Sequence, residues 1–254
     1  PLCLFEIRMS PQLHRIFYGA HASADFNQTM RYGGYRPTVF LQHGLAVALW
    51  MMIATLVGIW LWKSGSLTRI FNWPIQWALI PLIITFILCK STGAYFLILF
   101  GLGILWIGSQ FNTRIPLVFL LGYIVLYIVQ SSLTGSNIPD QIMDGLAGFL
   151  PEDRIESMQF RAFNEELLGE KARQRLLFGW GGWGRSRVYD AYGEDLTVTD
   201  SSWIITFGHN GIFGLYTQTI ALLAPIVHFL KTYAARLWRS PHIGPVAVLT
   251  VSLA

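Results

Sequence analysis

The sequence from Gly44 to Trp62, GLAVALWMMIATLVGIWLW, decides the fold class. Its side chains are apolar or small throughout, and no charged residue interrupts it. A helix that crosses the hydrocarbon core of a bilayer needs about 20 such residues. The stretch therefore predicts a membrane-spanning helix.

The composition of the whole chain supports the same class. Of the 254 residues, 53% are hydrophobic and 13% are charged, whereas ordinary soluble domains carry about 25% charged residues. Cys3 and Cys89 show no spacing typical of metal ligands. The chain begins without Met and ends within an apolar run, so we expect a fragment that lacks helices at both ends.

Further apolar runs predict an all-α polytopic membrane protein with about six spans. None of the fourteen acidic and eighteen basic residues falls inside the predicted spans, as expected from the cost of a charge at mid-bilayer. The other predicted spans are Pro74–Cys89, Thr92–Gly108, Ile115–Ser131, Trp203–Leu230 and a truncated Ile243–Ala254.

The loops between these spans predict the orientation of the chain. The loops Lys63–Trp73, Ser109–Arg114 and Lys231–His242 contain basic residues and no acidic ones, and short loops of this kind are cytoplasmic. The opposite, extracytoplasmic side then holds the N-terminal segment and a large loop. We divide the chain into residues 1–131, the loop 132–202 and the C-terminal spans 203–254.

The large outer loop contains a predicted amphipathic helix. Pro151, Glu152 and Asp153 are typical of a helix start. From Ile155 to Leu176 apolar residues recur mostly at steps of three and four, which indicates a helix with one apolar face.

The predicted helix ends at FGWGGWGRSR, Phe178–Arg187. Its glycines match G-x-G-x-x-G, but a dinucleotide site requires a preceding strand within a βαβ unit. Two interpretations remain open. The glycines either stop the helix while two tryptophans lie at the membrane interface, or they let backbone N–H groups bind an anion beside Arg185 and Arg187.

Four other polar residues are candidates for a site on the outer side. Lys90 lies in a tight turn between two predicted spans, Arg36 precedes Pro37 before the first span, and Arg161 lies on the amphipathic helix, where Glu165 is a possible partner one turn later. Snorkelling at the membrane interface is the alternative role for such cations. His209 lies at the outer end of the fifth span, where a neutral imidazole can accept a proton from a hydroxyl.

These pieces together resemble the O-antigen ligase and polymerase superfamily of bacterial membrane proteins. The resemblance extends from about Tyr35 to Leu215 and depends on the order of four motifs on one face. Lys90 stands where the family usually has Arg, and a lysine lacks the bidentate geometry of a guanidinium. The motifs are YRPTVFLQHGL, CKSTGAYFLILFGLG, SMQFRAFNEELLGEKARQRLLFGWGGWGR and GHNGIFGL.

The resemblance implies a GT-C-like, metal-independent glycosyltransferase without cofactor in the bacterial inner membrane. Its donor would be a polyprenyl-diphosphate-linked glycan, its acceptor a glycan or lipid, and its active site extracytoplasmic; membrane lipid is the other expected partner, and nucleic acid is not expected. Arg161 and Lys90, joined by Arg36 and Arg185, would bind the diphosphate. Arg161 would also be catalytic, and His209 would activate or orient the acceptor hydroxyl.

Two other functions remain open. A transporter or flippase for the same lipid-linked glycan would show charges inside its spans, or broken helices in matched halves. The sequence shows no charge inside a span and no clear broken pair. A membrane scaffold whose loop binds partners is the third possibility.

Overall fold

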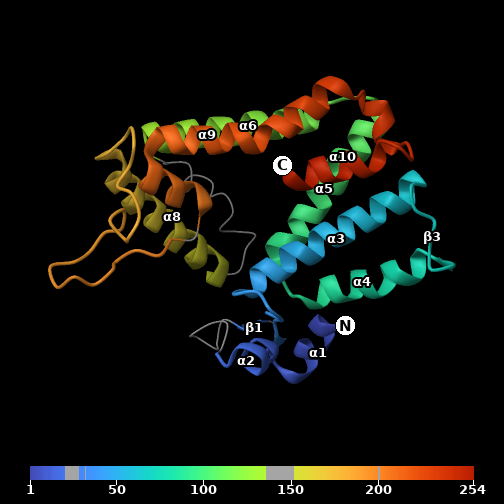
Figure 1. Ribbon diagram of the computed structural model, residues 1–254, viewed down its shortest axis with the longest axis horizontal. Helices are drawn as coiled ribbons and strands as arrows, with labels where there is room; N and C mark the ends of the chain where they lie inside the picture. The colour runs from blue at the N-terminus through green and yellow to red at the C-terminus, as the bar shows by residue number, and fades with distance from the viewer. Residues whose placement is uncertain (21–28, 32, 136–151, 200) are drawn as a thin grey trace. The chain divides into compact units, whose positions relative to one another are not determined.

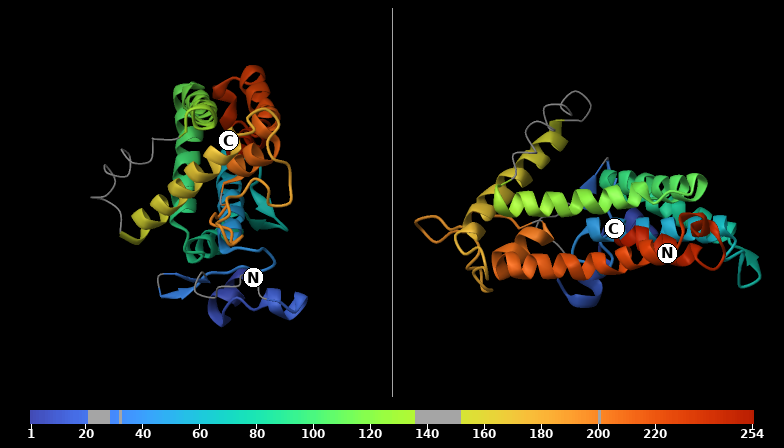
Figure 2. Two further views of the ribbon diagram at one scale, coloured as in Figure 1. Left: turned by 90° about the vertical axis from the view of Figure 1, so that its left-hand side faces the viewer. Right: turned by 90° about the horizontal axis from the view of Figure 1, so that it is seen from above.

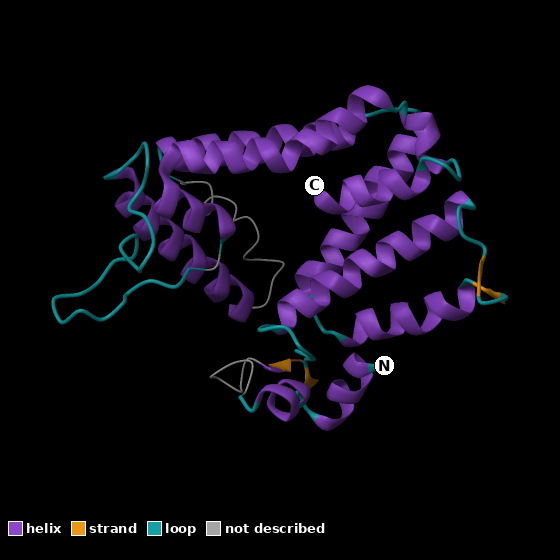
Figure 3. Cartoon of the chain, in the orientation of Figure 1, coloured by secondary structure: helices purple, strands orange, loops and turns teal. Residues whose placement is uncertain are grey.

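The computed structural model describes residues 1–20, 29–31, 33–135, 152–199 and 201–254, and most of them are helical. Figure 3 shows helices as the main elements, with short strands in two hairpins. The predicted start of the outer loop, over 136–151, lies outside the described residues. The all-α class of the prediction is confirmed.

Four described helices are long and apolar enough to cross a membrane (Figure 1). They are α3 (Gly44–Ser64), α5 (Thr92–Phe111), α6 (Ile115–Leu133) and α9 (Ser202–Thr232).

The other two predicted spans form shorter apolar helices, α4 (Gln76–Leu88) and α10 (Gly244–Leu253). Helix α4 begins later than predicted because Trp73–Pro74 form strand β4, paired with strand β3 (Arg69–Ile70).

The chain divides into two compact units. The first contains Pro1–Val118 and Ile226–Ala254, and the second contains Phe119–Pro225. The division falls inside α6 and α9, so it differs from the three parts defined by the predicted topology.

In the first unit, α3 packs against α4, α5 and α10. The short 3₁₀ helix η2 (Ala235–Arg239) packs against α5. Trp238 of η2 is fully buried and its carbonyl accepts a hydrogen bond of 2.9 Å from the indole of Trp60. Gly108 of α5 leaves room for this ring, since a Cβ there would lie 2.6 Å from it.

The N-terminal segment of the first unit is held by a buried carboxylate. It comprises α1 (Leu2–Met9), α2 (Leu13–Tyr18), β1 (Met30–Arg31) and β2 (Gly34–Tyr35). Glu6 of α1 accepts hydrogen bonds from the backbone N–H groups of Leu13, Thr38 and Val39, at 2.9, 2.8 and 2.6 Å. These bonds satisfy a charged group that burial would otherwise destabilise.

The second unit contains α8 (Glu152–Arg173), the described part of the outer loop, and parts of α6 and α9. In this unit α6 and α9 lie side by side in both directions of view (Figure 2). The ring of Tyr127 packs edge-on against Trp203, and the hydroxyls of Ser132 and Tyr216 lie 3.1 Å apart. The predicted helix is present and ends at Arg173. Its buried Leu168 and Ala172 join the core formed with α9, whereas Met158, Phe160 and Phe163 of the predicted apolar face are exposed.

Candidate functional site

Helix α9 is broken at Gly211. The break lies close to the end of the helix that the loop charges predict to be extracytoplasmic. Gly211 has φ 64° and ψ −164°, a backbone conformation open essentially to glycine alone. The segment Ser202–Asn210 and the segment Ile212–Thr232 are therefore separate helical pieces. The later piece retains the length of about 20 residues that a span requires. The span predicted over Trp203–Leu230 corresponds to α9, and the structure adds the break at Gly211.

The broken ends of α9 are capped by the backbone of residues 176–181, where the turn after α8 meets the glycine-rich segment. A helix end leaves N–H or C=O groups without partners inside the helix. Here the carbonyls before the break accept from the segment, and the N–H groups after the break donate to it. The four bonds are Trp180 N to Gly208 O (2.8 Å), Gly181 N to His209 O (2.9 Å), Ile212 N to Leu176 O (2.8 Å) and Phe213 N to Leu177 O (3.3 Å).

Gly179 and Gly211 make this close approach possible. A Cβ on Gly179 would lie 2.6 Å from the backbone N of Gly211. A Cβ on Gly211 would overlap the backbone of Leu177. Both glycines also have positive φ, at 69° and 64°. Two backbones can therefore touch only because neither residue has a side chain.

This geometry bears on the anion interpretation at Trp180 and Gly181. The N–H groups of Trp180 and Gly181 donate to α9, so they do not form an anion site. Trp180 packs on α8, with its indole donating to the Lys171 carbonyl at 2.7 Å. The Lys171 ammonium and the Arg175 guanidinium lie 4.2 and 4.3 Å from its ring. Trp183, in contrast, is 97% exposed.

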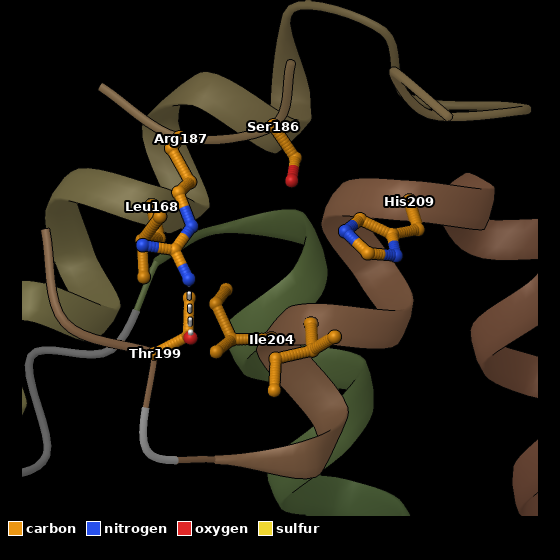
Figure 4. A pocket seen from close by; sticks show the side chains of 7 residues that line it. Leu168, Ser186, Arg187, Thr199, Ile204 and His209 are labelled. Carbon is orange, nitrogen blue, oxygen red and sulfur yellow. Dashed lines mark hydrogen bonds between the residues drawn. The ribbon is translucent and has the colours of Figure 1, made fainter. Parts of the chain in front are cut away.

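A polar pocket of about 240 Å³ lies beside the break, within the second unit. Figure 4 shows the side chains of Arg187 and His209 on opposite sides of this space. Ser186 is buried and packs on Gly208, where a Cβ would lie 2.9 Å from the Ser186 Cβ. The lining, which we call the His209 pocket, is Leu168, Ser186, Arg187, Thr199, Ile204, Ile205 and His209.

An ion pair and a hydrogen bond orient Arg187 in the His209 pocket. Its Nη1 donates to the Asp195 carboxylate, and its Nη2 lies 3.5 Å from the Thr199 hydroxyl. Burial alone would raise the pKa of Asp195, but hydrogen bonds from Arg187 and Thr197 outweigh it and lower this pKa below its ordinary value.

Helix α8 anchors the far end of the same loop. Asn164 is buried, and its side-chain oxygen accepts from the backbone N–H of Val198 at 2.7 Å. Glu165 accepts hydrogen bonds from the hydroxyls of Ser201 and Tyr127. Glu165, which the sequence suggests as a partner for Arg161, therefore connects the loop to α6 through these two hydrogen bonds.

The first unit contains a separate basic cluster formed by Arg36, Lys90 and Ser91. Arg36 is 2% exposed, and its Nη2 lies 3.5 Å from the Ser91 hydroxyl. The Lys90 ammonium lies against the backbone of Gly34, directly before Tyr35 and Arg36. Lys90 has a φ of 52°, which is uncommon for a residue with a side chain. The cluster lies at the N-terminus of α5, where the helix dipole favours anions.

The predicted site residues are thus distributed over both units. Arg36 and Lys90 come together in the first unit. Arg161 lies on an exposed face of α8, and Arg185 donates to the Gly182 carbonyl at 3.1 Å. Neither belongs to the described lining of the His209 pocket.

The sequence names Arg187 beside Arg185 in the anion interpretation of the glycine-rich stretch, but Arg187 is not among the residues predicted to bind the diphosphate. Its role depends on Asp195 and Thr199, which are far along the loop. Among the described residues, no group of three or more His, Cys, Asp or Glu side chains is arranged to hold a metal ion.

The chain matches no protein-family model, no curated protein and no solved structure.

Proposed function

We propose that the chain is a membrane glycosyltransferase that ligates or polymerises a polyprenyl-diphosphate-linked glycan. In this proposal the protein is GT-C-like, has about six spans and acts without metal at the outer face of the bacterial inner membrane. The observation that carries the proposal is the His209 pocket beside the break in α9. The four motifs that resemble the O-antigen ligase and polymerase superfamily support it.

The His209 pocket suits activation of an acceptor hydroxyl. A neutral imidazole nitrogen of His209 takes the proton as the acceptor oxygen bonds to the anomeric carbon of the donor sugar. The bond from that carbon to the diphosphate oxygen breaks, and the diphosphate leaves with the electron pair. The apolar side chains of Leu168 and Ile204 line the same space, which favours exclusion of water that would compete as acceptor.

The Arg36–Lys90 cluster suits the diphosphate. A diphosphate leaving group needs its developing negative charge stabilised, which fixed cations do without protonating it. Arg36 is buried and lies 3.5 Å from the Ser91 hydroxyl, and Lys90 adds a point charge. Arg161 keeps its predicted role in binding this group, together with Arg185.

A transporter of the same lipid is the second candidate, because α9 is broken. In secondary transporters, broken helices occur in corresponding positions of two repeats. The break here lies at the outer end of α9, and it is filled by backbone from the glycine-rich segment. This packing favours a fixed structural role over the moving parts of a transporter.

The test is glycan transfer by the purified protein supplied with a polyprenyl-diphosphate glycan. We expect His209→Ala to lower kcat about 10²- to 10⁴-fold, as for loss of a general base. Arg161→Ala should abolish transfer, and a chelator should leave it unchanged. His228→Ala is the matched control, since this histidine lies exposed on the same helix. Normal transfer by both the His209 and the Arg161 variant would refute the assignment.

A further inference from the structure

The polar groups of the His209 pocket form a set rich in hydrogen-bond donors. Arg187 brings a guanidinium, Ser186 and Thr199 bring hydroxyls, and His209 brings an imidazole. None of the described residues that line the pocket carries a carboxylate. Such a set favours a ligand rich in acceptor oxygens, because Arg has donors only and hydroxyls adapt to either role.

Arg187 is oriented before any ligand binds. The Asp195 carboxylate holds its Nη1 from outside the lining of the pocket, and Thr199 contacts Nη2 at 3.5 Å. A guanidinium binds a carboxylate through two parallel hydrogen bonds. A guanidinium that is already fixed loses less conformational entropy when it does so.

The charge of the pocket is too small for a diphosphate. The positive charge of Arg187 is balanced by Asp195, so the pair contributes no net charge. A diphosphate carries several negative charges and needs more cations than this pocket holds. The apolar side chains of Leu168, Ile204 and Ile205 offer surfaces for the carbon face of a ring.

We infer that the His209 pocket binds an acidic sugar residue, with its carboxylate on Arg187. The inference rests on the proposed function and narrows it, because it makes the glycan that is transferred or extended a uronic-acid polymer. Arg187 is then the residue that selects the acidic glycan, and His209 is the residue that activates its hydroxyl.

The test is direct binding of digalacturonate to the purified full chain in detergent, by calorimetry. We expect Arg187→Gln to weaken binding about 10- to 100-fold, the usual effect of losing hydrogen bonds between charged groups. The carboxyl-reduced disaccharide should bind wild type and Arg187→Gln equally weakly. Inorganic pyrophosphate should bind independently of Arg187. Pyrophosphate binding that depends on Arg187 and exceeds digalacturonate binding would overturn the inference.

Two variants separate ligand binding from support of the loop. Asp195→Asn removes the ion pair that orients Arg187 but leaves the guanidinium in the loop beside the pocket, so we expect digalacturonate affinity to fall less than in Arg187→Gln, by about ten-fold at most. An equal loss in Asp195→Asn and Arg187→Gln would assign Arg187 to loop structure and refute the inference. Arg69→Gln removes an exposed cation of the first unit and should not change binding.

The binding measurement requires no transfer reaction. The acidic-sugar pocket and the transferase function can therefore be refuted independently of each other. Binding that depends on Arg187 in a protein without transferase activity would keep the acidic-sugar pocket and refute the transferase. Transfer of a neutral glycan as efficiently as an acidic one would refute the acidic-sugar pocket and leave the transferase standing.

Discussion

Two glycines far apart in the sequence set the local geometry of the site. Gly179 follows the turn after α8, and Gly211 breaks α9. Each backbone occupies the space in which a side chain of the other would lie. His209, two residues before the break, is held by a backbone contact, since its carbonyl accepts from the N–H of Gly181.

We expect Gly179→Ala and Gly211→Ala to destabilise the protein severely. The left-handed conformation alone costs an L-residue about 1–2 kcal/mol, and the overlap of Cβ with backbone adds to this. Thermal unfolding in detergent measures the effect. Gly193→Ala is a control for conformation alone, because its φ is 84° with nothing within 4 Å. Gly182→Ala introduces neither a positive φ nor a Cβ overlap, so it should leave the unfolding temperature unchanged. Equal losses of stability at all four positions would contradict this account of Gly179 and Gly211.

At the scale of elements, the loop from Ser186 to Thr199 is held at several points. Ser186 packs on α9, Asn164 of α8 binds Val198, and Tyr189 pairs with Asp195 in an isolated antiparallel bridge. Asp195 also accepts hydrogen bonds from Thr197 at 2.9 and 2.8 Å. The carboxylate of Asp195 thus joins the folding of the loop to the orientation of Arg187.

We expect the loop to loosen in acid because of Asp195. The folded-state pKa of Asp195 is lowered, so its contribution to stability is complete above the unfolded pKa and is lost as the pH falls through the folded value. Below about pH 4, the protection of amides 187–199 against hydrogen exchange, relative to unfolded peptide at the same pH, should fall. Asp195→Asn should show low protection in this segment at every pH. A wild-type loop that stays protected down to pH 2 would contradict this account.

At the scale of the whole molecule, charge and hydropathy fix the expected topology. The four long helices are apolar, and basic residues without acidic ones occupy the loops between α3 and α4 and between α5 and α6. Both the outer loop and the Lys90 turn then belong to the opposite side. The candidate residues share that side only if this topology holds.

Cysteine labelling tests the topology. With Cys3 and Cys89 replaced by alanine, Glu194→Cys should react with an impermeant maleimide in intact cells, because Glu194 is exposed on the predicted outer loop. Thr68→Cys, exposed in the predicted cytoplasmic loop, should react only after permeabilisation. The reverse labelling pattern would show the opposite orientation in the membrane and would place the candidate site on the cytoplasmic face.

The long apolar helices were predictable because the thickness of a bilayer sets their length. The juxtaposition of Arg36 and Lys90 was partly predictable, since each precedes a membrane helix that begins on the predicted extracytoplasmic side. The break at Gly211 was not, because glycine is common inside membrane helices and this break depends on a partner at Gly179. The place of Arg187 likewise depends on tertiary contacts with Asp195 and Thr199.

The capped break in α9 also has a consequence for biogenesis. Until the glycine-rich segment is in place, the ends at Gly208 and Ile212 expose backbone groups that lipid cannot satisfy. The ribosome makes this segment before α9, so in the predicted topology the loop is exported before the helix that it caps is inserted. A delay in exporting the loop should therefore leave α9 stalled at the translocon, where quality-control proteases degrade the chain.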